Sequence, residues 1–148
     1  MTVFITHLLN VRDKPTFLCR LMGEFVGGQM SLEGSLSKCK FPEGMIAAHE
    51  EIGLLKRGSL HPRQDFVVLR LAPENIATIF KEVLAAGLSR EIIHVQIEYD
   101  GVLQLGAYDN FYPECVVTGP AVSASLLDEL KSKHVLRGFS TAQASDSG

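Results

Sequence analysis

The chain has 148 residues, of which 46% are hydrophobic and 21% charged, with a formal net charge of −3 at pH 7. This size and composition are those of one globular domain that can bury its own core, which excludes a disordered chain and a disulfide- or metal-dependent miniprotein. No apolar run approaches the roughly 20 residues that span a bilayer, and the first residues lack the basic and apolar regions of a signal peptide. We therefore expect a cytoplasmic protein that does not bind membranes.

Charge is distributed unevenly along the chain. Residues 1–74 hold nine Lys and Arg against eight Asp and Glu, whereas residues 75–148 hold five against nine. The basic residues of the first half are scattered, and nucleic-acid binding needs them clustered, so no nucleic-acid partner is expected. Residues 91–130 contain seven carboxylates and no Lys or Arg. A charged protein partner of that stretch should therefore carry a basic patch.

The first half of the chain predicts two strands and two helices. Residues 1–9 are apolar and rich in β-branched side chains, as in a strand. Asp13 can cap a helix over residues 14–26, whose apolar side chains recur at helical spacing. Apolar and polar residues alternate over 30–37, which predicts a half-buried strand. A second helix is expected over residues 42–57, because apolar residues recur every three or four positions.

The second half predicts more strands than helices. Residues 66–71 are apolar on both faces, which is typical of a central strand. A helix is expected to begin at Pro73 and to stop at Gly87. Residues 92–108 predict a β-hairpin, and residues 114–118 a short strand at a sheet edge. A last helix is expected to begin near Ser125 and to end near residue 138.

Two turn registers are possible for the hairpin. A two-residue turn at Asp100 and Gly101 would place polar residues opposite apolar ones on both faces. A turn with Gly101 as a bulge pairs Glu98 with Val102 instead and places apolar residues opposite one another. Because a one-residue slip would turn one strand's apolar set to water, the bulged register is expected. The face turned to solvent would then carry His94, Gln96, Glu98 and Gln104.

The order of these elements predicts an α+β fold. We expect a single domain over residues 1–139, with a mostly antiparallel or mixed sheet and about four helices packed on its apolar face. Residues 140–148 are small and polar and are expected to form a disordered tail.

A candidate partner- or ligand-binding surface combines the polar face of the hairpin with the residues that follow it. It consists of His94, Gln96, Glu98, Gln104, Tyr108, Asp109, Asn110, Glu114 and Cys115. Its acids favour a small, non-enzymatic protein-interaction domain, of the adaptor, chaperone or inhibitor kind, that binds a basic partner. One alternative is a small enzyme or ligand-binding domain with a pocket near residues 108–115. Another is a homo-oligomer that pairs through the edge of the strand over residues 114–118.

The sequence contains no motif that assigns a catalytic residue. Its five histidines are far apart, so neither a metal site nor a cofactor is expected. Cys115 and His94 could form a nucleophile and its base, but the neighbouring carboxylates disfavour the thiolate. The three cysteines are odd in number and lack CxxC spacing, so we expect reduced thiols. A binding protein is therefore favoured over an enzyme.

Overall fold

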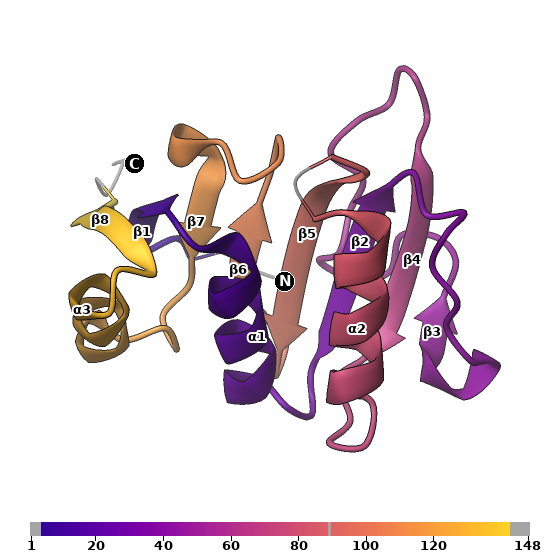
Figure 1. Ribbon diagram of the computed structural model, residues 1–148, viewed down its shortest axis with the longest axis horizontal. Helices are drawn as coiled ribbons and strands as arrows, with labels where there is room; N and C mark the ends of the chain where they lie inside the picture. Colours follow the sequence, from indigo (N-terminus) through magenta and orange to yellow (C-terminus); the bar gives the residue numbers. More distant parts are fainter. Residues whose placement is uncertain (1–3, 89, 143–148) are drawn as a thin grey trace.

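The computed structural model describes residues 4–88 and 90–142. Over these residues the chain forms three α-helices and eight strands, which make one antiparallel sheet (Figure 1). In chain order the elements are β1 (His7–Val11), α1 (Lys14–Glu24), β2 (Gln29–Gly34), the 3₁₀ turn η1 (Glu43–Met45), β3 (Ile46–Ala48), β4 (Asp65–Arg70), α2 (Ile76–Ala86), β5 (Ile92–Tyr99), β6 (Val102–Ala107), the 3₁₀ turn η2 (Pro113–Cys115), β7 (Val116–Thr118), α3 (Ala124–Ser132) and β8 (Leu136–Thr141). The strand order across the sheet is β3-β4-β2-β5-β6-β7-β1-β8.

The helices and the apolar face of the sheet share one large core. Phe17 of α1, Ile79 of α2 and Leu127 of α3 are fully buried in it, together with Leu32 of β2 and Leu105 of β6. The predicted antiparallel α+β fold is confirmed, whereas the predicted count of about four helices is wrong, since the described residues form three. None of these helices is long and apolar enough to cross a bilayer.

The local signals that begin α1 and end α2 are confirmed, whereas α1 ends at Glu24 rather than at residue 26 and α2 begins at Ile76 rather than at Pro73. The Asp13 carboxylate accepts a hydrogen bond from the Thr16 amide at 3.2 Å and so caps α1. Gly87, with φ 104°, ends α2 in a backbone conformation that favours glycine. The first strand begins at His7 rather than at the chain start, and residues 1–3 lie outside the described residues.

The helix predicted over residues 42–57 is wrong. The chain forms η1 and then β3, in which Ile46 pairs with Leu69 of β4. Residues 49–64, here called the cover segment, follow as an irregular stretch. The physical reason lies in β4, which is apolar on both faces. Its Val67 and Leu69 pack in the large core, while Phe66 and Val68 form a second small core with Leu55 of the cover segment.

The hairpin turn is the two-residue turn that the sequence analysis rejected. Tyr99 pairs with Val102, and Asp100 and Gly101 both have positive φ, at 54° and 78°. Two consecutive positive φ values are typical of a type I′ turn, which matches the twist of antiparallel strands. The bulge expected at Gly101 is therefore absent from that position.

A bulge within the same pair of strands, close to the turn, restores the apolar register. Ile97 pairs with Leu105 and Glu98 pairs with Leu103, so Gln104 is the extra residue on β6. Leu105 consequently lies in the large core, whereas Leu103 joins the small core on the opposite face. The rejected turn and the apolar pairing coexist because the bulge shifts the register between them.

The end of the chain also differs from expectation. The strand over residues 114–118 was expected at an edge, but β7 lies between β6 and β1, and the sheet edges are β3 and β8. The last helix is capped by Ser123 and ends at Ser132, and the chain returns as β8 beside β1. Ser140 and Thr141, which were assigned to the tail, belong to β8, while residues 143–148 lie outside the described residues.

Candidate functional site

The polar face of the hairpin is buried, not exposed. His94, Gln96 and Gln104 are 4%, 5% and 3% exposed. The expectation that these side chains face water is wrong, because the cover segment crosses the sheet face that carries His94 and Gln96. Three of the nine residues proposed for partner binding therefore have almost no accessible surface. Glu98, Tyr108, Asn110 and Cys115 are half-buried, and Asp109 and Glu114 are exposed.

Gln96 lies at the centre of a buried polar network. Its side-chain oxygen accepts hydrogen bonds from the Ser31 hydroxyl at 3.0 Å and from the Lys56 amide at 2.9 Å. Its side-chain nitrogen donates to the Tyr108 hydroxyl at 3.0 Å. Burial raises the pKa of Tyr108, and the hydrogen bond from Gln96 offsets part of that effect. The network ties the cover segment to β2 and β5.

The hydrogen bonds of His94 define its role. Its Nδ1 accepts from the Asp109 amide at 3.1 Å, which assigns the proton of the neutral ring to Nε2. Nε2 then donates to the Ser59 hydroxyl at 2.9 Å. A base that activates a serine needs the opposite arrangement, with an unprotonated nitrogen facing the hydroxyl. The pair therefore holds the cover segment in place and is not arranged for nucleophilic catalysis.

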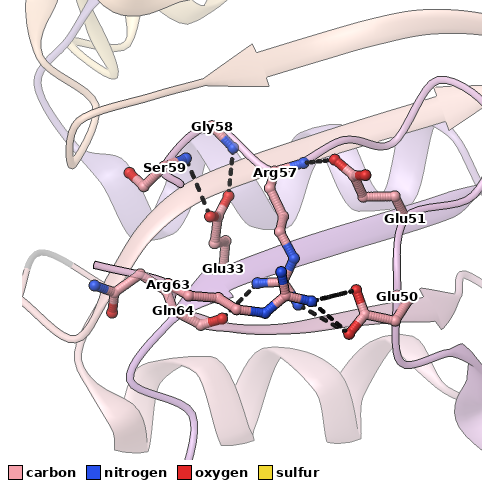
Figure 2. Close-up of polar contacts among 8 residues, drawn as sticks. All are labelled: Glu33, Glu50, Glu51, Arg57, Gly58, Ser59, Arg63 and Gln64. Atoms are coloured by element: carbon pink, nitrogen blue, oxygen red, sulfur yellow. Dashed lines mark hydrogen bonds and ion pairs between the residues drawn. The ribbon is translucent and has the colours of Figure 1, made fainter. Parts of the chain in front are cut away.

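Glu33 anchors the same part of the cover segment from β2. Its carboxylate is 1% exposed and accepts from the Gly58 amide at 2.7 Å and the Ser59 amide at 3.2 Å (Figure 2). The Arg57 amide donates in turn to Glu51 at 2.7 Å. With the bond from Lys56 to Gln96, four consecutive backbone amides each donate to a side-chain oxygen. The alternation over residues 30–37 predicted a half-buried strand, so the polar Glu33 was expected on the solvent side and this role was missed.

The remaining predicted residues do not converge on a pocket. Gln104 accepts from the Ala121 amide at 2.9 Å and so supports the loop before α3. Cys115 contacts the Asp109 carboxylate at 3.6 Å, and no hydrogen bond joins it to His94 among the described residues. Burial raises the pKa of the Cys115 thiol, and the hydrogen bond to Asp109 raises it further. The thiol is therefore a poor nucleophile, as the neighbouring acids led us to expect.

A hollow near the predicted pocket has different walls from those expected. Its volume is about 680 Å³, and of the nine predicted residues it includes Glu114 alone. Its lining consists of Leu8, Leu9, Asn10, Pro113, Glu114, Gly138, Phe139 and Ser140. The structure therefore places no group of the buried polar network at this position.

A larger cleft lies at the other end of the sheet, between the cover segment, β4 and the chain that precedes β3. We call it the arginine cleft; its volume is about 710 Å³. Its walls mix apolar side chains with two arginines and their partners. The lining residues are Leu36, Ser37, Cys39, Phe41, Ile46, His49, Glu50, Arg57, Arg63, Gln64, Asp65, Phe66 and Val67.

Two arginines of this cleft meet at one carboxylate (Figure 2). One terminal nitrogen of Arg57 lies 3.1 and 3.2 Å from the two Glu50 oxygens, and one of Arg63 lies 3.1 and 3.0 Å from them. The hydrogen bond from Arg57, more than that from Arg63, holds the pKa of Glu50 below its usual range. The Arg57 side chain is 5% exposed, whereas those of Glu50 and Arg63 are each 63% exposed.

Arg57 is fixed from several sides. Its guanidinium lies over the Phe66 ring at 5.0 Å from the centroid and donates to the Gln64 carbonyl. Its Nε is buried and has no hydrogen-bond partner within the described residues. In the sequence Arg57 and Arg63 are two of the scattered basic residues, because no local spacing shows that an irregular segment brings them together.

The side chains of the arginine cleft offer groups that can bind an anion and an apolar surface. Two guanidinium groups can bind a planar oxyanion, and the apolar wall can bury a hydrocarbon group. Burial raises the pKa of the Cys39 thiol, which disfavours a reactive thiolate in this wall. Within the described residues no group of His, Cys, Asp and Glu is placed to hold a metal ion. Comparison of the chain with protein-family models, with curated proteins and with solved structures finds no match.

Proposed function

We propose that this protein is a small-molecule-binding domain whose ligand occupies the arginine cleft. One observation carries the proposal: a cleft of about 710 Å³ has an apolar wall beside a guanidinium that is almost wholly buried. Ligand sites typically have volumes of roughly 300–1,000 Å³ and combine apolar surface with a few fixed polar groups. Arg57 supplies the fixed polar group, and Phe41, Ile46 and Val67 contribute apolar surface.

A neutral amphipathic probe tests this proposal. We expect 1-hexanol to shift the backbone amide NMR signals of cleft-lining residues in a saturable titration. The variant Ser37→Trp should abolish these shifts, because Ser37 is exposed and lines the cleft, so that an indole there fills it. Ser35→Trp is the matched control, since Ser35 is exposed but does not line the cleft. Shifts that persist in Ser37→Trp would place the ligand elsewhere.

A protein-interaction function, expected from the sequence, is a second proposal. It is supported by the acids that stay at the surface, namely the exposed Asp109 and Glu114 and the half-buried Glu98, in a stretch without Lys or Arg. It no longer draws on His94, Gln96 or Gln104, which are buried. Reversing these three acid charges to Lys should slow association with a basic protein partner, and the wild-type rate should fall as salt rises. An unchanged association rate would show that these acids do not take part in binding.

A further inference from the structure

Taking the proposed ligand-binding cleft as its basis, we infer that the ligand carries a carboxylate, which replaces Glu50 between Arg57 and Arg63. Glu50 then acts as an internal competitor for the site. The chemical class of the ligand is thus an apolar group that ends in a carboxylate. Three features of the described residues support it in turn.

The first feature is the position of the Glu50 carboxylate. Both of its oxygens lie within 3.2 Å of a terminal nitrogen from Arg57 and of one from Arg63. The chain itself thus shows that a carboxylate fits between the two guanidinium groups (Figure 2). Charge-assisted bonds of this kind are stronger than those between neutral groups. A ligand carboxylate in the same place would form the same set of bonds.

The second feature is the unequal exposure of the three side chains. Glu50 and Arg63 are each 63% exposed, so water screens their attraction and competes for their hydrogen bonds. Arg57 is 5% exposed and keeps its contacts with Phe66 and Gln64 when Glu50 leaves. Glu50 can therefore move into solvent, whereas the buried guanidinium stays in position. A receptor group that is already fixed loses little conformational entropy on binding.

The third feature is the charge of the surrounding wall. Besides Glu50, the acid that lines the cleft is Asp65, and its carboxylate accepts a hydrogen bond from the Leu36 amide at 3.0 Å. Once Glu50 leaves, the acid that remains in the lining is Asp65, whose carboxylate is bound to backbone. The vacated position is then cationic and borders an apolar surface formed by Phe41, Ile46 and Val67. That combination suits an apolar carboxylate better than an inorganic anion or a neutral lipid.

The test compares hexanoate with 1-hexanol, which share an apolar chain and differ in charge. In NMR titrations of the full chain at neutral pH, we expect hexanoate to bind about tenfold more tightly than 1-hexanol. Glu50→Gln should tighten hexanoate binding by several-fold and leave 1-hexanol binding unchanged, because it removes the competing charge. Arg63→Met should reduce the preference for hexanoate, because one of the two guanidinium groups is removed. Both substituted residues are exposed, so both variants are expected to fold.

A matched control is Glu43→Gln, which removes an exposed acid charge outside the cleft lining and should change neither affinity. If 1-hexanol binds in the cleft while hexanoate binds no more tightly, the carboxylate inference is overturned and the proposed cleft function stands. The inference also fails if Glu50→Gln tightens both probes equally, since that result indicates a wider cleft rather than a removed competitor. If neither probe shifts the cleft residues, the proposed function itself fails.

Discussion

The contact between Gly58 and His94 determines how closely the cover segment packs on β5. A Cβ added at Gly58 would lie 2.9 Å from Cδ2 and 3.0 Å from Nε2 of the His94 ring. Ordinary contacts of this kind begin at 3.4 Å, so the two groups would have to separate by about 0.5 Å. The ring has little freedom to retreat, because both of its nitrogens are hydrogen-bonded and the Tyr108 ring lies 5.6 Å away.

We therefore expect Gly58→Ala to lower the free energy of unfolding by about 1–3 kcal/mol, the usual cost of an overpacked site. The cover segment would have to lift, which lengthens the hydrogen bonds from Gly58 and Ser59 to Glu33. Urea unfolding measures the loss. Gly44→Ala is the control, because nothing lies within 4 Å of a Cβ there, and its effect should stay within about 0.5 kcal/mol.

A double-mutant cycle separates this overlap from a general effect of alanine. In a His94→Ala background the ring is gone, so adding Gly58→Ala should cost close to nothing. The overlap with His94 is refuted if Gly58→Ala is as harmless as Gly44→Ala, or if it costs the same in both backgrounds. Either outcome would show that the cover segment does not rest on His94 in the way described.

Three further predictions concern other parts of the fold. Ser123→Ala should cost about 0.5–2 kcal/mol in urea unfolding because its hydroxyl caps α3 at 3.1 Å, whereas Ser125→Ala should stay within about 0.5 kcal/mol. Thr118→Val should be neutral or stabilising, since the buried Thr118 hydroxyl has no partner among the described residues; a loss above about 1 kcal/mol would contradict this. A hydrogen bond from Arg20 lowers the pKa of Glu129 to about 2, so its contribution to stability is present above pH 4.5 and is lost as pH falls to about 2. Unfolding titrations over that range should show a weaker pH dependence for Glu129→Gln, and an unchanged dependence would contradict the assignment.

Local signals in the sequence were enough to predict the helix ends that a capping or terminating residue defines. Asp13 caps α1 through its own side chain, and Gly87 ends α2 with a positive φ, and both positions were predicted. The strand over Asp65–Arg70 follows from its unbroken apolar run. At both helix ends the deciding interaction lies within a few residues of the residue that signals it.

The wrong assignments depend on contacts between distant residues. Residues 46–48 lie in a stretch, residues 42–57, that has the apolar spacing of a helix, yet they pair with β4, about 20 residues later in the chain. Leu136–Thr141 follow α3 after a short turn and form a strand because β1, near the start of the chain, offers an open edge. Spacing in a short window does not show that such a partner exists, and tertiary pairing overrides it.

The candidate site was mispredicted for a related reason. The alternation of apolar and polar residues in the hairpin showed that one face is apolar and the other polar. It did not show that the cover segment lies over the polar face. Polar side chains such as His94 and Gln96 hydrogen-bond to that segment instead of facing water. The convergence of Arg57 and Arg63 on Glu50 depends on the same irregular segment, so no spacing rule could indicate it.

The run of four amides from Lys56 to Ser59 has a consequence for thermal behaviour. The amides on either side of Arg57 are hydrogen-bonded to Gln96 and Glu33, which lie beneath the cover segment. The position of the Arg57 guanidinium therefore depends on these buried groups. Warming that frees those amides would release the guanidinium while the helices and the main core stay intact. Ligand binding at the proposed site should then fade at a lower temperature than the cooperative melting of the fold.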